Sequence, residues 1–304
     1  MTAQHNILCI GSVLWDVIGR AQFHMRVGSD VPGRITRLPG GVAMNIAMTL
    51  ARFGMRPALL SAVGRDSEGD ELVRACEAFG MEVGFLYRSD DLPTDKYMAV
   101  EGANGLIAAI ADAHSLEQAG DKILRPMADG RLGSEEAPFG GMVALDGNLT
   151  LGLLEEIAVS PLFAKADLRV APASPGKAER LLPFLNHSRA VLYVNCEEAG
   201  LLCQCAFEDA AAAAKGLLER GAVRVLVTNG GEMAAEGNSE GNSGQAGGII
   251  TALPPKVLVT RVTGAGDTFM AAHIAAEARG NTGEAALQAA LSAAAAYVSG
   301  EAAV

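Results

Sequence analysis

Short apolar runs and amphipathic segments alternate along the first part of the chain. Residues 6–13 (NILCIGSV) and 57–64 (PALLSAVG) each contain a short apolar run closed by a glycine, Gly11 in the first and Gly64 in the second. These runs predict two buried strands. Residues 41–54 and 70–80 show helical spacing instead, and each ends in a glycine where a left-handed helix terminator is expected. In residues 41–54 the spacing is set by Val42, Ile46, Leu50 and Phe53. The order strand, helix, strand, helix is typical of a parallel sheet.

The same alternation returns in the second half of the chain. Further strands are expected at residues 142–147, 168–173, 190–195 and 223–231. Further helices are expected at residues 151–159, 207–221 and 283–300, and another helix follows Asp267. This pattern predicts an α/β fold: a doubly wound, mostly parallel sheet with helices on both faces.

Two segments do not fit that pattern. Residues 16–39 lack a good helix, and residues 96–112 have the pattern of a hairpin around the sequence GANG. Both fit a small separate β-layer that reaches out from the main sheet. Residues 236–248 are rich in Gly, Ser and Asn, which indicates a mobile loop joining two short strands.

Composition narrows the class of protein. Half of the 304 residues are apolar, the net charge is −11 and the pI is about 5.0. A chain with this negative charge is poorly suited to bind nucleic acid or a membrane surface through Lys and Arg side chains. The start has no pattern of a signal peptide, and no apolar run reaches the roughly 18 residues of a membrane span.

The cysteine content points to a reducing compartment, and hence to the cytoplasm. Five cysteines are an odd number in a large chain, which favours free thiols over a disulfide framework. Three of them lie close together in sequence, namely Cys196, Cys203 and Cys205. We expect buried free cysteines there, with a metal site as the alternative.

The glycine-rich stretch Thr263–Asp267 carries the first candidate chemistry. The phosphate-loop pattern G-x-x-x-x-G-K-[ST] and the dinucleotide pattern G-x-G-x-x-G are both absent from the chain. Consecutive backbone N–H groups at a helix N-terminus can instead cradle an anion, and Gly264 and Gly266 permit close approach. Asp267 would repel a phosphate, but it can accept a proton from a second reactant. The alternative is a helix cap after a glycine loop.

Two further clusters suggest hydroxyl and magnesium binding. Gly40 and Gly41 precede a helix with Asn45 in its first turn, and Asp16 follows the first strand. Amide and carboxylate groups suit sugar hydroxyls, although a turn with a polar helix start explains the same residues. Asn195 and Glu198, three apart after a strand, can hold Mg²⁺ through water or can simply cap a helix.

Together these clusters resemble the ribokinase-like (PfkB) family of carbohydrate and nucleoside kinases. The N-terminal signature corresponds to GGVAMNIAMTLARFG, the C-terminal one to VTGAGDTFMAA, and the N-x-x-E element to Asn195–Glu198. The likeness runs from about residue 6 to residue 300. It implies a single ribokinase-like kinase domain over residues 1–304. It also implies a β-sheet lid from segments about 16–39 and 95–113, a lid that often forms a homodimer interface.

The resemblance also implies ATP and Mg²⁺ as cofactors, and a role for each candidate residue. Asp267 is the implied base, and the amides of Gly264, Ala265 and Gly266 form the implied anion hole. The implied substrate-binding residues are Asp16, Gly40, Gly41 and Asn45. The implied nucleotide-binding residues are Asn195, Thr228, Gly230 and Thr263, with Asn195 and Glu198 organising Mg²⁺ through water.

Within the family, the first half of the chain is similar to bacterial pseudouridine kinases. It has P-T-x-x-Y at residues 93–97, then the hairpin, then A-I-A-D. This implies ATP-dependent phosphorylation of the 5′-hydroxyl of pseudouridine, with Thr94 and Tyr97 where the lid meets the nucleoside. Ribose, another sugar or a purine nucleoside is the alternative substrate. A non-catalytic sugar- or nucleoside-binding protein is the alternative from another class.

One position departs from the family pattern. The residue six before the implied base is often acidic and contributes to a monovalent-cation site near the anion hole. Here that residue is Arg261. A positive side chain disfavours a neighbouring cation, so dependence on K⁺ stays open.

Overall fold

The computed structural model describes residues 7–239 and 247–301. Its centre is an eight-stranded sheet with the order β14-β13-β12-β11-β10-β9-β1-β4. The six strands from β4 to β12 in this order are all parallel, and β13 is antiparallel to both of its neighbours, β12 and β14. The strands are β1 Ile7–Ile10, β4 Ala58–Leu60, β9 Met142–Asp146, β10 Asp167–Ala171, β11 Ala190–Asn195, β12 Arg224–Thr228, β13 Ala234–Asn238 and β14 Gly248–Ala252.

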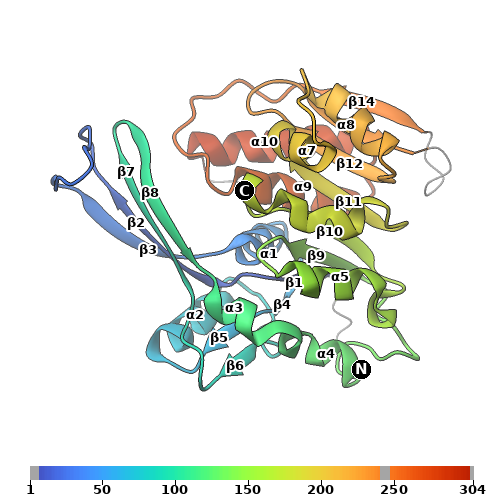
Figure 1. Cartoon of the computed structure of the whole chain (residues 1–304), viewed down its shortest axis with the longest axis horizontal. Coiled ribbons are helices and arrows are strands. Elements are labelled where there is room, and N and C mark those ends of the chain that lie inside the picture. The colour runs from blue at the N-terminus through green and yellow to red at the C-terminus, as the bar shows by residue number, and fades with distance from the viewer. Residues whose placement is uncertain (1–6, 240–246, 302–304) are drawn as a thin grey trace.

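Helices cover both faces of this sheet, as predicted (Figure 1). One face packs against α1 Val42–Arg52, α2 Ser67–Ala78, α9 Ala265–Ala278 and α10 Glu284–Ser299. The other packs against α3 His114–Ala119, α4 Arg125–Ala128, α5 Leu151–Val159, α6 Leu182–Leu185, α7 Cys196–Cys203 and α8 Ala210–Glu219. In the part of the chain that the structure describes, no helix is long and apolar enough to cross a membrane.

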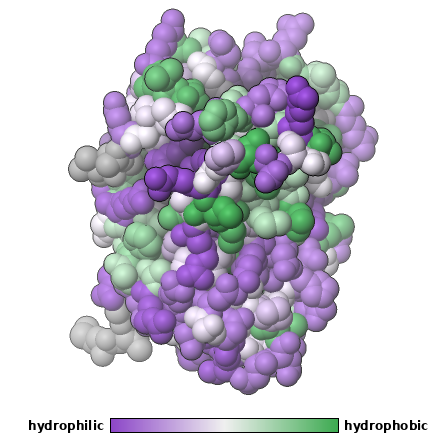
Figure 2. Space-filling view, turned by 90° about the vertical axis from the view of Figure 1, so that its left-hand side faces the viewer, coloured by the Kyte–Doolittle hydropathy of each residue, from purple (hydrophilic) through white to green (hydrophobic). Residues whose placement is uncertain are grey.

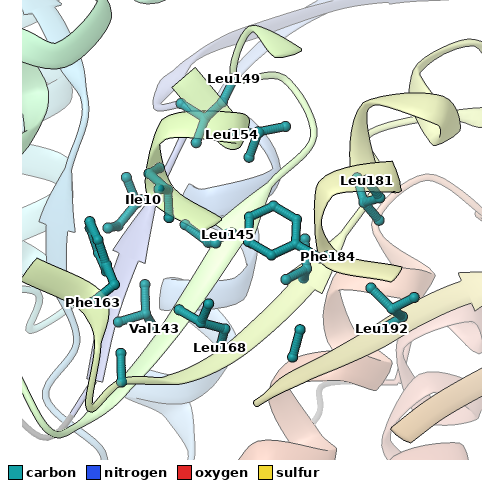
Figure 3. Close-up of a cluster of buried hydrophobic side chains, with 14 of the residues drawn as sticks. Ile10, Val143, Leu145, Leu149, Leu154, Phe163, Leu168, Leu181, Phe184 and Leu192 are labelled. Carbon is teal, nitrogen blue, oxygen red and sulfur yellow. The ribbon is translucent and has the colours of Figure 1, made fainter. Parts of the chain in front are cut away.

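Strand alternation divides the core into two layers. On β9, Val143 and Leu145 enter the layer under α5 and α6, whereas Ala144 between them enters the layer under α9. Figure 3 shows the first layer, in which side chains of four neighbouring strands meet Phe184 and Leu154 of the covering helices. Because both faces are covered, the central strands read as continuous apolar runs in the sequence.

A second sheet of four strands, which we call the lid, reaches out from the main body (Figure 1). Its order is β3-β2-β7-β8, with β2 Leu14–Arg20, β3 Arg34–Gly40, β7 Lys96–Gly102 and β8 Gly105–Asp112. These strands confirm the separate β-layer and the hairpin around GANG. A third, two-stranded sheet joins β5 Ala62–Gly64 to β6 Tyr87–Ser89.

Contacts at the base of the lid join it to α2. The Trp15 indole N–H donates to the Glu68 backbone oxygen at 3.0 Å, and Lys96 pairs with the Glu68 carboxylate at 2.6 Å. The guanidinium of Arg37 lies 4.2 Å above the Trp15 ring and pairs with the Glu71 carboxylate of α2. Lid strands β2, β3 and β7 are therefore all anchored to one helix.

A buried ion-pair network fastens the C-terminal half of α9 to the sheet. Glu277 pairs with Arg169 of β10 at 2.5 Å and with Arg224 of β12 at 2.6 Å. Arg224 also pairs with Glu236 of β13 at 2.6 Å. Each buried charge thus has a partner of opposite sign, which the low-dielectric interior requires.

The structure differs from the sequence-based expectations in three places. The predicted strand 57–64 is two strands in different sheets, β4 and β5, because the chain leaves the main sheet at Ser61. Helices α3, α4 and α6 fall in segments where no helix was predicted. The predicted loop 236–248 begins inside β13 and ends at β14, and its residues 240–246 lie outside the described residues.

Candidate active site

The candidate site lies at the carboxyl edge of the parallel strands. Asp146, Asn195 and Thr228 are the last residues of β9, β11 and β12, and Asn195 and Thr228 are register partners. The chain winds outward in one direction from β1 to β4 and in the other from β9 to β12. Such a switch point, here between β1 and β9, leaves a crevice in which open α/β sheets bind ligands.

The loop before α9 presents backbone amides at this edge. Gly264 is the N-cap of α9 and has φ of 86°, in the left-handed region that favours glycine. The Ala265 amide donates to the Val262 oxygen at 3.0 Å. Among the described residues, no hydrogen bond engages the amides of Gly264, Gly266 or Asp267. The expectation for Ala265 is thus corrected, because its amide closes a turn.

The Asp267 carboxylate is the chemical centre of the site. Asn45 of α1 donates its side-chain N–H to Asp267 Oδ2 at 2.9 Å. The pKa of Asp267 is raised to about 7, and burial is the largest cause. The hydrogen bond from Asn45 lowers this pKa, whereas the negative charges of Asp146, Asp16 and Glu198 raise it. A carboxyl with this pKa can accept a proton near neutral pH.

The glycine pair before α1 is explained by close contacts. A Cβ on Gly40 would lie 2.1 Å from Asp16 Oδ2, and one on Gly41 would lie 2.5 Å from the Ser12 oxygen. Gly41 also has φ of 96°. The absence of side chains lets Asp16 stand close to the start of α1, where Asn45 is carried. Burial raises the pKa of Asp16 to about 6.

The two lid residues predicted to meet the substrate differ in position. Tyr97 is the register partner of Asp16 across β2 and β7, so both side chains point to the same face of the lid. Thr94 is only 3% exposed, and its hydroxyl donates to Asp66 Oδ1 at 2.6 Å. Asp66 caps α2 through Gly69 N. The expectation for Thr94 is thus corrected: it braces the base of the lid, because its hydroxyl already has a partner.

On the other side of the crevice, Asn195 and Glu198 form a capping box. Glu198 N donates to Asn195 Oδ1 at 2.9 Å, and Asn195 N donates to Glu198 Oε2 at 2.8 Å. Burial raises the pKa of Glu198 to about 7. Gly230 follows β12 in an exposed turn with φ of 57°. The capping interpretation of Asn195 and Glu198 is therefore correct, and it leaves one Glu198 oxygen without a hydrogen bond from the described residues.

A cluster at the switch point was not predicted. Asp146 Oδ2 accepts from Ser12 N at 2.8 Å and from Ser12 Oγ at 2.5 Å, and Ser12 Oγ in turn accepts from Val42 N at 2.9 Å. Asn148 donates to the same Ser12 hydroxyl at 3.1 Å and accepts from Lys177 at 2.5 Å. The signal in the sequence was Asp146 at a strand end, the same kind of position as Asn195.

The cysteine cluster shows no metal-binding arrangement. All five cysteines are free, but the expected burial of the cluster is wrong: Cys196 and Cys203 are half-buried and Cys205 is exposed. Within residues 7–239 and 247–301, no group of three or more His, Cys, Asp or Glu side chains is placed to hold a metal ion.

Comparison with known proteins agrees with this geometry. The chain matches the model of the pfkB family carbohydrate kinases over residues 4–303. It is 29% identical over 286 residues to the pseudouridine kinase of Escherichia coli, covering 89% of this chain and 83% of that protein. A carbohydrate kinase from Agrobacterium tumefaciens superposes with a TM-score of 0.78 at 25% identity, over 98% of this chain and 92% of its own.

The ribokinase of Arabidopsis thaliana, solved with ribose and ATP, shares the fold with a TM-score of 0.77. It is 20% identical and covers 96% of this chain and 92% of its own. The chain therefore belongs to the PfkB family and has the ribokinase-like fold with its lid. It is a kinase that transfers a phosphoryl group to an alcohol of a sugar or nucleoside.

The raised pKa of Asp267 predicts a pH-dependent cost in stability. The folded state binds the Asp267 proton more tightly than the unfolded state, so this contribution to stability is present at low pH. It is lost as the pH rises from about 4 to about 7. Asp267→Asn removes the titration, so we expect its melting temperature to exceed that of the wild type by about 2 °C or more at pH 8.

The measurement is thermal unfolding of both proteins at pH 5 and pH 8. The difference in melting temperature should grow between the two pH values. Glu219→Gln, which changes an exposed carboxylate on α8, should follow the wild type at both. A variant that is no more stable than the wild type at pH 8 would show that Asp267 is not strained by burial.

Proposed function

We propose that this kinase transfers the γ-phosphoryl group of ATP to the 5′-hydroxyl of pseudouridine. The observation that carries the proposal is the position of Asp267, a carboxyl with a pKa of about 7. It lies beside helix N-terminal amides that no described residue engages in a hydrogen bond. A hydroxyl nucleophile needs a base, and a transferring phosphoryl group needs positive partial charge. Here both lie within one turn of chain.

In this mechanism Asp267 accepts the proton of the attacking hydroxyl. The Asn45 N–H keeps the Asp267 carboxylate oriented. The Asn45 side-chain amide can also form a hydrogen bond with a substrate hydroxyl. The amides of Gly264, Gly266 and Asp267 face the transferring group and stabilise its negative charge. The Asp267 amide takes the place assigned from the sequence to that of Ala265.

The nucleotide is proposed to bind along the ends of β11 and β12. Asn195 and Thr228 are partners there, with Gly230 in the next turn and Thr263 across the crevice at the loop before α9. When bound, Mg²⁺ would neutralise phosphate charge, with waters oriented by Asn195 and Glu198. The oxygen atoms of Asn195 and Glu198 suit Mg²⁺ and its waters. The negative charges of Asp146, Asp16 and Glu198, which raise the pKa of Asp267, also favour a cation here.

The substrate is proposed to lie between the lid and α1. Asp16 and Tyr97 point from one face of the lid, and Gly40 and Gly41 leave room beside Asp16. A carboxylate can accept from two neighbouring ribose hydroxyls, and a tyrosine ring offers a surface for a base. Similarity to the pseudouridine kinase of Escherichia coli supports the choice of nucleoside.

Arg261 bears on the open question of dependence on K⁺. Backbone oxygens near the anion loop already accept protein donors: Tyr297 O from Arg261 Nε, and Val298 O from Thr260 N. The positive charge of Arg261 lies beside these oxygens and disfavours a cation there. We therefore propose that ATP and Mg²⁺ suffice. The free thiols fit a cytoplasmic enzyme.

Asp267→Asn tests the proposed base. The amide cannot accept the proton, so kcat should fall by at least about 100-fold with a milder change in KM. Steady-state kinetics at saturating ATP would measure this, and the unfolding data above would show that the variant is folded. Turnover close to that of the wild type would contradict the assignment of Asp267 as the base.

A substrate panel tests the nucleoside. ATP consumption should be fastest with pseudouridine when it is compared with uridine, adenosine, ribose and fructose at equal concentration. Preference for ribose or fructose over every nucleoside would replace the proposal by a sugar kinase. Tight ligand binding without phosphate transfer in Mg-ATP would instead support a non-catalytic binding protein.

The lid is also proposed to form a homodimer. Met98 and Ile110 are register partners on the face of the lid opposite Asp16, and Ile35 points to the same face. They are 46%, 60% and 79% exposed. Figure 2 looks onto the side of the molecule that carries the lid and shows hydrophobic side chains at this surface. A second copy that offers the same face would cover them by symmetry.

Ile110→Glu should convert the dimer into a monomer, because it places a charge in the covered face. Light scattering during size-exclusion chromatography would measure the mass. Val159→Glu, at an exposed position of α5, is the matched control and should leave the mass unchanged. A wild-type protein that is monomeric at micromolar concentration would refute the dimer.

A further inference from the structure

The loop that leads into α9 is held by few buried contacts. Leu258 is 82% exposed and Val262 is 71% exposed, although both are apolar. Thr263 and Gly266 are also at least partly accessible to solvent. Burial therefore does not fix the conformation of the amides that the proposed mechanism needs, and some other contact must do so.

Hydrogen bonds to the end of α10 hold this loop instead. Thr260 N and Arg261 N donate to the Val298 oxygen at 2.8 and 3.2 Å. Arg261 Nε donates to the Tyr297 oxygen at 2.8 Å. The Arg261 guanidinium lies 3.9 Å from the centre of the Tyr297 ring, so one side chain contacts both the backbone and the ring of the same tyrosine.

Tyr297 passes this restraint to the anion loop. Its hydroxyl donates to the Thr263 oxygen at 2.8 Å. The C=O of Thr263 and the N–H of Gly264 belong to one planar trans peptide, so they point in opposite directions. Holding the Thr263 oxygen against Tyr297 therefore aims the Gly264 N–H away from Tyr297.

The fit between Tyr297 and the loop also requires Gly264. A Cβ on Gly264 would lie 2.6 Å from the Tyr297 hydroxyl oxygen. The glycine that the anion loop needs for its positive φ is thus also needed for the approach of the tyrosine. Both contacts act on the same peptide unit.

We propose that Arg261 and Tyr297 form a latch that positions the anion loop for phosphoryl transfer. Arg261 orients Tyr297, and Tyr297 fixes the Thr263–Gly264 peptide so that its N–H faces the transferring group. Arg261 and Tyr297 are positioning residues, since they act through that peptide. The inference rests on the proposed role of the loop as the anion hole.

An arginine is required because two properties of its side chain are used together. The planar guanidinium stacks on the ring, and its Nε–H points along the plane to a backbone oxygen. A lysine at this position supplies the charge but has neither the plane nor the Nε donor. Arg261→Lys should therefore lower kcat as much as substitution by an uncharged residue does.

The test compares variants of the latch by steady-state kinetics with the best substrate of the panel. Arg261→Met and Tyr297→Phe should each lower kcat by about tenfold and leave KM for the alcohol substrate within about twofold. Tyr297→Phe keeps the stacked ring and removes only the bond to Thr263. The double variant should be no slower than the slower single variant, because both act through one peptide.

The chain supplies a matched control in Arg279. Its guanidinium lies 5.3 Å from the centre of the Phe53 ring, and its Nη2 donates to the Phe53 oxygen at 2.7 Å. This is the same kind of contact at the opposite end of α9. Arg279→Met should leave kcat within about twofold of the wild type, so a loss in both arginine variants would indicate a merely structural effect and overturn the latch.

Hydrogen exchange gives a readout that needs no substrate. Amides in the peptide that covers residues 257–270 should exchange faster in Arg261→Met and Tyr297→Phe than in the wild type or Arg279→Met. Unchanged exchange together with unchanged kcat in the latch variants would refute the inference while the wild type stays active. A wild type inactive with every substrate would refute the proposed function instead.

Discussion

Helix α1 packs against α9 on one face of the sheet, and the hydrogen bond from Asn45 to Asp267 joins their first turns. The two residues are 222 positions apart in the chain. Because both helices begin at this point, the glycine turn before α1 and the anion loop before α9 meet around a single carboxylate. The proposed substrate side and the proposed phosphate side of the site meet at that one contact.

The cost of this arrangement is electrostatic. Asp16, Glu198 and Asp267 are all partly or fully withdrawn from water, and the pKa of each is raised. The opposite end of α9 compensates, since Glu277 there is paired with Arg169 and Arg224. One helix thus carries an unfavourable, reactive carboxylate at its start and a well-paired one near its end, as expected where function is maintained at the expense of stability.

The lid follows from the two-residue period of its strands. Asp16 and Tyr97 face one way, whereas Met98 and Ile110 face the other. One sheet can therefore offer a polar surface to a ligand and an apolar surface to another protein. The base of the lid is held by two hydrogen bonds, from the Thr94 hydroxyl to the Asp66 carboxylate and from the Trp15 indole to the Glu68 backbone oxygen. These bonds link the position of Asp16 to α2.

Local patterns in the sequence were sufficient for the parallel sheet, most of its covering helices and the lid. Strand and helix periods are properties of neighbouring residues, and glycine before a helix is a local signal. The partners of each group were decided only by tertiary structure. Thr94 bonds to Asp66, Ser12 bonds to Asp146, and Arg261 stacks on Tyr297. These contacts join residues distant in sequence, so no spacing within one segment could reveal them.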